Sequence, residues 1–185
     1  NAAIGNAVAR SEAAGRSVSC RKGCSACCRA QPVPVTPTEA QAIKRLVESM
    51  PEARRSTVTA RFEARVDRLR EAGLLPVFLN PPARMGLDEA RKAAEAYFQL
   101  GLVCPFLDDD ACSIHPHRPF VCRQYLVTSD PALCTDPLAN PVEVIPMPLS
   151  AAGAMLDTAA QALGRRQHTV PLVLALLRAD ADAHD

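Results

Sequence analysis

The segment Cys20-Arg-Lys-Gly-Cys24-Ser-Ala-Cys27-Cys28 places four of the eight cysteines of the chain within nine residues. Gaps of two and three residues let a turn bring neighbouring thiolates to one soft metal ion or cluster. Gly23 supports a tight turn there, because glycine adopts backbone conformations that other residues avoid. We therefore expect a metal centre at this segment.

A second group of cysteines lies far along the chain, after 75 cysteine-free residues. It reads Cys104-Pro-Phe-Leu, then Cys112-Ser-Ile, then Arg118-Pro-Phe-Val-Cys122-Arg123, and it ends at Cys134. These spacings are too long for an independent compact site, so we expect the second group to complete sites that the first group begins. The predicted metal ligands are Cys20, Cys24, Cys27, Cys28, Cys104, Cys112, Cys122 and Cys134.

Three other uses of the cysteines remain open. An even number of cysteines could form disulfides, although a chain of this size does not need them and adjacent Cys27 and Cys28 are hard to pair without strain. One of these two, or Cys134, could be a small buried apolar residue. Cys24 and Cys27 could form a redox dithiol, but the βαβ setting of such motifs is not visible in the sequence.

The two cysteine blocks together resemble a known family. In order and separation, residues 20–36 and 104–125 are similar to the YkgJ-type cysteine cluster family, which is described as zinc- or iron-chelating. Flagellin lysine N-methylases carry a similar cluster that is linked to a [4Fe-4S] centre, in much longer chains. The resemblance implies a metal-binding protein, and it leaves a cluster-dependent enzyme such as a protein-modifying methyltransferase as an alternative.

The first group also matches the C-x3-C-x2-C signature of radical S-adenosylmethionine enzymes. Ala26 stands before the third cysteine, where that family usually has an aromatic residue. The alternation of strand and helix that a partial barrel requires is also missing from the sequence pattern. Both observations disfavour this assignment.

The metal centre itself is predicted to be an iron–sulfur cluster. Four thiolates around Zn²⁺ or a [4Fe-4S] cluster carry a net charge of about −2, which nearby cations stabilise. Arg118 and Arg123 bracket Cys122 and are the predicted cofactor-binding cations, while His115 and His117 are alternative ligands. We expect one [4Fe-4S] cluster, held chiefly by the first group with Cys122 or a neighbour, in a structural, electron-transfer or sensing role. Zinc is the alternative cofactor.

Composition limits the other classes of function. The chain has 185 residues, consistent with a single domain over residues 1–185. Its net charge of +1 gives no basic field for nucleic acid, and we expect no membrane span because no apolar run approaches about 18 residues. Free thiolate ligands require a reducing compartment, so we expect a cytoplasmic protein. The sequence pattern identifies neither a protein partner nor a small-molecule substrate.

The predicted fold is mainly α: a small helical bundle with Pro-rich irregular cysteine segments organised around the metal centre. Aromatic residues make up only 4% of the chain, and alanine is abundant, which favours close-packed helices. Thr36-Pro37-Thr38-Glu39 is a strong helix start signal. An ordered loop is expected over 74–87 and an extended segment over 142–145. The expected helices cover residues 2–17, 37–49, 51–72, 88–100, 151–163 and 171–181.

Overall fold

The structure is a computed structural model that describes residues 2–82, 85–148, 150–164 and 167–182. It is mainly helical, as the sequence predicts. The α-helices are α1 (Ala2–Ala13), α2 (Pro37–Glu48), α3 (Glu52–Glu71), α4 (Leu75–Leu79), α5 (Leu87–Gln99), α6 (Phe120–Gln124), α7 (Ala151–Leu163) and α8 (Ala175–Asp182). Short 3-10 helices are η1 (Cys27–Arg29), η2 (His115–His117), η3 (Pro131–Thr135) and η4 (Leu172–Leu174).

The strands are only two residues long, and both pairs are antiparallel. β1 (Pro34–Val35) pairs with β4 (Val170–Pro171), and β2 (Leu107–Asp108) pairs with β3 (Ala111–Cys112). β1 directly precedes α2, so its pairing with β4 ties the start of that helix to the C-terminal segment. The described strands therefore form neither a βαβ unit nor a partial barrel, which argues against the redox-dithiol and radical-enzyme alternatives.

The start of α2 follows its sequence signal. The Thr36 side chain accepts a hydrogen bond from the Glu39 amide, the Glu39 carboxylate accepts one from the Thr36 amide, and Pro37 occupies the first turn. This capping box satisfies amides that the helix itself leaves unpaired. Ala40, Ile43 and Val47 then form the buried face of α2.

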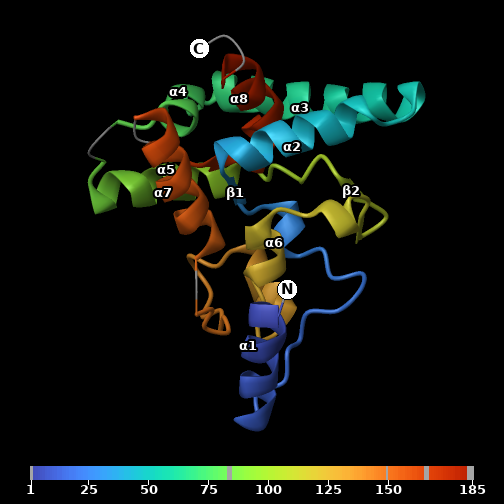
Figure 1. The fold of residues 1–185 in the computed structure, drawn as a ribbon, viewed down its shortest axis with the longest axis vertical. Helices are drawn as coiled ribbons and strands as arrows, with labels where there is room; N and C mark the ends of the chain where they lie inside the picture. Colours follow the sequence, from blue (N-terminus) through green and yellow to red (C-terminus); the bar gives the residue numbers. More distant parts are fainter. Residues whose placement is uncertain (1, 83–84, 149, 165–166, 183–185) are drawn as a thin grey trace.

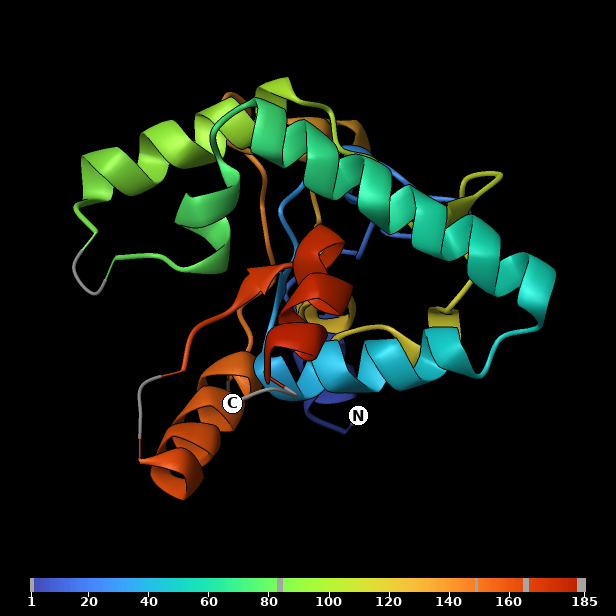
Figure 2. The ribbon, with the colours of Figure 1, turned by 90° about the horizontal axis from the view of Figure 1, so that it is seen from above.

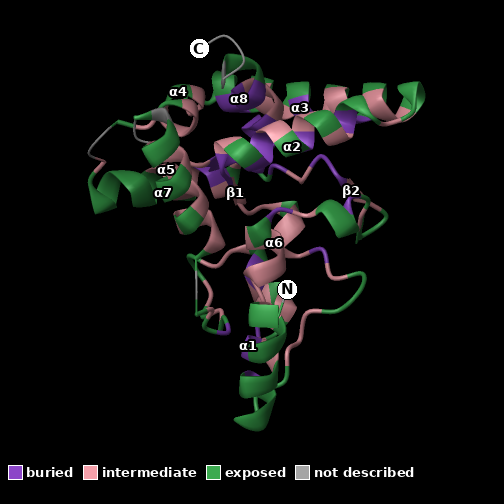
Figure 3. Ribbon diagram, viewed as in Figure 1, coloured by how far each residue is buried: buried purple, intermediate pink, exposed green. Residues whose placement is uncertain are grey.

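The main core lies among α2, α3, η4 and α8. Figure 2 shows α8 between α2 and α3, and α2 packs extensively on α8. Figure 3 shows buried residues on α2 and α8, whereas α1 and α7 are largely exposed or half-buried. Figure 1 places this core at one end of the molecule and α1 at the other, with α6 between them. The cysteine-bearing segments lie in this middle region.

The second cysteine segment is anchored on the core by an aromatic contact. Phe106 is fully buried, and its ring meets that of Phe62 on α3 edge-to-face, with centroids 5.4 Å apart and planes at 74°. Such pairs add about 0.5–1.5 kcal/mol to the burial of the rings. Because Phe106 lies two residues after Cys104, this contact fixes the position of that cysteine.

Several predicted boundaries need correction. The loop expected over 74–87 contains α4; Pro76 does not break this helix because it lies in the first turn, where proline is tolerated. Residues 83 and 84 of that loop lie outside the described part. The first helix ends at Ala13 rather than 17, and Gly15 follows with φ of +74°.

The predictions for the C-terminal part also need correction. The helix expected over 171–181 is divided into β4, η4 and α8. The extended segment expected over 142–145 forms one bridge, between Val144 and Val127.

Candidate metal centre

The first cysteine group forms a tight turn followed by η1. The Cys24 amide donates to the Arg21 carbonyl at 3.0 Å, and Gly23 has φ of +85°, as the predicted turn requires. This turn separates Cys20 from Cys24, while Cys27 and Cys28 lie on η1. The segment therefore presents its sulfurs from a compact, irregular backbone.

The second group is spread over several short elements. Cys104 precedes the β2–β3 hairpin, Cys112 ends β3, Cys122 lies on α6 and Cys134 lies on η3. At the hairpin tip, Asp109 and Asp110 both have positive φ. A short hairpin and a helix of little more than one turn thus replace the irregular chain that the sequence predicts here.

Direct contacts join the two groups. The Cys104 amide donates to the Cys28 carbonyl at 2.7 Å. The Ser25 hydroxyl donates to Asp110 at 2.6 Å, and Arg29 forms an ion pair with the same carboxylate. The sequence does not predict that Ser25 and Arg29 bind Asp110, although an arginine in one cysteine segment and an acidic turn in the other are compatible with such a contact.

The two groups share one cavity of about 510 Å³. Its walls also contain Arg118, Tyr125 and buried apolar residues such as Phe106. Cys134 is buried on η3 and is not among the lining residues. The cysteines that line the cavity are Cys20, Cys24, Cys27, Cys28, Cys104, Cys112 and Cys122.

All eight cysteines are free thiols, so the structure contains none of the disulfides of the alternative assignment. Burial raises the pKa of both Cys104 and Cys122 to about 12, and neighbouring thiols add to the effect. A hydrogen bond with Cys28, together with burial, raises the pKa of Cys27. In the described part of the chain, no three Cys, His, Asp or Glu side chains lie close enough to hold a single ion.

Backbone amides point at several sulfurs. The amides of Phe106 and Ile114 hydrogen-bond to Cys104 and Cys112, each two residues earlier in the chain, and these bonds oppose the rise in the thiol pKa values. Hydrogen bonds of this kind stabilise thiolates and tune metal centres that they ligate. The sequence does not predict these amide–sulfur hydrogen bonds. The donor lies two residues after the cysteine at both positions, which is compatible with them.

The two predicted cofactor-binding arginines lie in different settings. Arg118 lines the cavity, and its buried Nε has no hydrogen-bond partner among the residues that the structure describes. Its charge partly offsets the raised pKa of Cys27 and Cys122. Arg123 instead donates to the Arg118 carbonyl at 2.7 Å and to the Pro116 carbonyl at 2.9 Å, so it holds the loop that carries Arg118.

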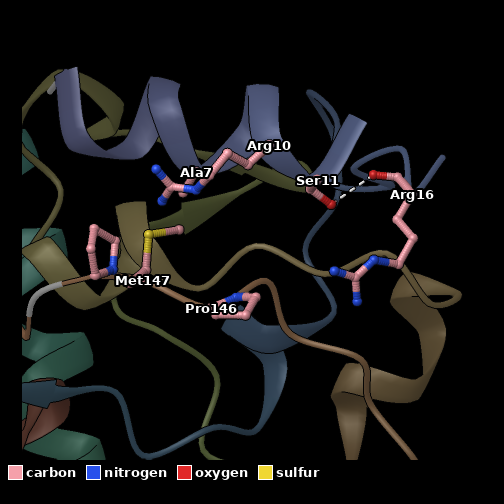
Figure 4. A pocket seen from close by; sticks show the side chains of 7 residues that line it. Ala7, Arg10, Ser11, Arg16, Pro146 and Met147 are labelled. Carbon is pink, nitrogen blue, oxygen red and sulfur yellow. Dashed lines mark hydrogen bonds between the residues drawn. The ribbon is translucent and has the colours of Figure 1, made fainter. Parts of the chain in front are cut away.

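The two predicted alternative ligands are also separated. His115 belongs to the cavity lining, whereas His117 does not. Another cavity, of about 240 Å³, lies between α1 and the Pro146–Pro148 segment. Figure 4 shows Arg10 and Met147 at this second cavity, whose lining contains no cysteine.

Comparison with known families agrees with this arrangement. The CxxCxxCC family, described as a "putative zinc- or iron-chelating domain", matches residues 19–138, more than half of the chain. The chain belongs to this family. The CxxCxxCC match spans every cysteine from Cys20 to Cys134, so zinc or iron chelation by cysteines is the shared property. No curated protein and no solved structure matches the chain. In the described part, each helix is too short or too polar to cross a bilayer.

Proposed function

We propose that this protein binds a [4Fe-4S] cluster through Cys27, Cys104, Cys112 and Cys122. The observation that carries the proposal is the shared cavity: η1, the segment before β2, β3 and α6 each contribute one of these thiols to its walls. Every pair among the four interacts electrostatically, because in each pair one thiolate raises the pKa of the other thiol. Three of these four ligands come from the second cysteine group, whereas the sequence predicts a cluster held chiefly by the first group.

The size of the cavity favours a cluster over a single ion. A tetrahedral zinc site places all four sulfurs about 2.3 Å from one ion and needs little further space. A cubane cluster instead places its four cysteine ligands on four different irons. A cavity of about 510 Å³ with thiols on several walls fits the larger group better.

The setting of Arg118 indicates that these residues fit an anionic cluster. Its Nε is buried, and no residue of the described ranges gives it a hydrogen-bond partner, a costly state in the absence of a compensating interaction. A cluster with four thiolates carries a negative charge of about −2, which this guanidinium would stabilise by charge and by hydrogen bonding to sulfur. When bound, the cluster would supply one-electron redox chemistry, while Arg118 and the amides of Phe106 and Ile114 would tune it.

The role that follows is structural, electron-transferring or sensing. Zinc is the second candidate, since the family description includes it. The cavity also has more room than a closed structural site requires, which keeps a cluster-dependent enzyme, such as a protein-modifying methyltransferase, as a candidate. Binding of S-adenosylmethionine in calorimetry would favour that candidate. Retention of thiolate ligands is consistent with a reducing compartment such as the cytoplasm.

The test compares two cysteine variants after anaerobic purification. Cys122→Ser should lose most of its iron and acid-labile sulfide, because serine oxygen is a poor substitute for a cluster thiolate. Cys28→Ser is the matched control, since Cys28 lines the same cavity but is not in the proposed ligand set. Full iron in Cys122→Ser, or equal loss in both variants, would reject this ligand assignment.

A further inference from the structure

The α1 wall of the second cavity carries an arginine beside two buried small residues. Ala7, Arg10 and Ser11 line this cavity, and their i, i+3 and i+4 spacing places them on one face of the helix. Ala7 and Ser11 are each only 3% exposed. Because these two small side chains are packed, the face of α1 that presents Arg10 is fixed in position.

The opposite wall is the Pro146–Pro148 segment, which is anchored at the preceding residue. Ile145 is buried, and its amide donates to the Leu126 carbonyl at 2.9 Å. The two prolines have restricted backbone angles, and Met147 lies between them in the sequence. This wall is therefore restrained, and it contributes apolar side chains and no charge to the cavity.

Arg16 reaches the cavity through the turn that ends α1. Gly15 has a positive φ, and its amide donates to the Glu12 carbonyl at 2.9 Å. The Arg16 amide donates to the Ser11 carbonyl at 3.0 Å, which completes a Schellman motif. The Ser11 hydroxyl also donates to the Arg16 carbonyl at 2.7 Å, as Figure 4 shows. The backbone of Arg16 is thus fixed against the helix that carries Arg10.

Two positive charges therefore border one small cavity. In Figure 4 the Arg10 guanidinium lies on the Met147 side, and the Arg16 guanidinium lies on the other side of Pro146. The described residues that line the cavity include no aspartate or glutamate. Within the described ranges, neither guanidinium has an ion pair or a hydrogen bond. The cavity therefore favours a ligand with a negative charge at each end and an apolar middle.

We propose that the second cavity binds a small dicarboxylate, with one carboxylate on Arg10 and the other on Arg16. A guanidinium can donate two parallel hydrogen bonds to a carboxylate. Ala7, Pro146 and Met147 would contact the aliphatic spacer between the two carboxylates. The cavity volume of about 240 Å³ lies below the about 300–1,000 Å³ of sites for drug-sized ligands, which indicates a small molecule. This site is separate from the metal centre and does not depend on the proposed function.

The test is calorimetric titration of the anaerobically purified protein with malonate, succinate, glutarate and adipate. Low ionic strength is needed because both arginines are exposed and salt screens their charges. One dicarboxylate should bind per chain with the highest affinity, because only a spacer of matching length reaches both guanidiniums. Butyrate and inorganic phosphate each reach one guanidinium and should bind about 10-fold more weakly. In an amide NMR spectrum, the best ligand should shift the signals of Ser11, Arg16 and Met147.

Arginine variants locate the site. Arg10→Ala and Arg16→Ala should each lower the affinity for the best dicarboxylate to about that of butyrate, with an unchanged circular dichroism spectrum because both side chains are exposed. Arg68→Ala is the matched control, since it removes an exposed positive charge from α3, outside this cavity, and should leave the affinity unchanged. The dicarboxylate site is rejected if no chain length binds more tightly than butyrate, if phosphate binds as tightly as the best dicarboxylate, or if Arg68→Ala loses as much affinity as Arg10→Ala.

Discussion

The amide of Cys104 donates a 2.7 Å hydrogen bond to the carbonyl of Cys28, so the backbones of the two cysteine groups are in direct contact. The protein itself therefore brings together segments that are 76 residues apart, as residue numbers 28 and 104 show. A metal centre at this junction would reinforce an existing contact rather than create one.

Metal removal is predicted to loosen the cysteine segments and to leave the helical core folded. The core residues of α2, α3 and α8 pack on one another, and none of them lines the cavity that the cysteines share. Amide hydrogen exchange with and without a chelator should show lost protection over 19–31 and 104–135 and retained protection over 40–69. Complete loss of helical circular dichroism on chelation would contradict this separation.

Glu39→Ala is predicted to destabilise the protein by about 1–3 kcal/mol, because it leaves buried amides unpaired. The Glu39 carboxylate accepts hydrogen bonds from the amides of Thr36 and Phe120, at 2.9 and 2.8 Å, and so links the start of α2 to the start of α6. Urea denaturation measures the change. Glu63→Ala, at an exposed position on α3, is the control and should change stability by less than about 0.5 kcal/mol.

Asp108→Asn is predicted to reduce stability at neutral pH and to weaken its dependence on acid. Burial opposes ionisation of Asp108, but hydrogen bonds from Arg54 and Arg61 outweigh it and hold the pKa of the carboxyl below its usual value. The stabilisation is therefore present above the unfolded-state pKa of about 3.9 and is lost as the pH falls through the folded-state value.

Thermal unfolding across the acid range checks this prediction. Asp67→Asn is the matched control, because Asp67 forms an exposed pair with Arg70 within α3 and should contribute little. Asp108 instead joins α3 to the β2–β3 hairpin that carries Cys112. Identical pH profiles for the wild type and Asp108→Asn would show that this link does not stabilise the fold.

Arg118→Met is predicted to weaken metal binding by about 10–100-fold, the usual cost of removing an outer partner of a metal site. Loss of a positive charge beside an anionic cluster should also shift its reduction potential to a more negative value. Arg118→Lys keeps the charge and should recover part of the potential. Chelator competition measures the metal affinity, and redox titration measures the reduction potential. An unchanged potential in Arg118→Met would show that the guanidinium does not interact with the cluster.

The sequence was informative where a local rule governs the structure. Thr36-Pro37-Thr38-Glu39 starts a helix as predicted, with a capping box between Thr36 and Glu39 that the structure adds, and the Gly23 turn is found as expected. α4 was missed because Leu74–Leu79 is an apolar, proline-containing stretch whose helix is too short for a periodic signal. The pairing of β4 with β1 interrupts the last predicted helix, and local sequence patterns do not predict pairing between distant segments.

Most residues that the sequence predicts for the site line one cavity, with Cys134 and Arg123 outside its lining, and their role as ligands stays a prediction. Clustering in the sequence identified the cysteines and Arg118, but it assigned the ligands chiefly to the first group. The distribution of the cysteines over the cavity walls depends on long-range contacts, such as those of Ser25 with Asp110 and of Phe62 with Phe106. The different roles of Arg118 and Arg123 likewise depend on the direction of each side chain, which neighbouring positions in the sequence do not reveal.

Iron and acid-labile sulfide analysis of the anaerobically purified wild type tests the central claim most directly. A [4Fe-4S] cluster at the shared cavity predicts about four irons and four sulfides per chain, with the broad visible absorbance of iron–thiolate charge transfer. Stoichiometric zinc in a colourless protein that contains neither iron nor sulfide would contradict it.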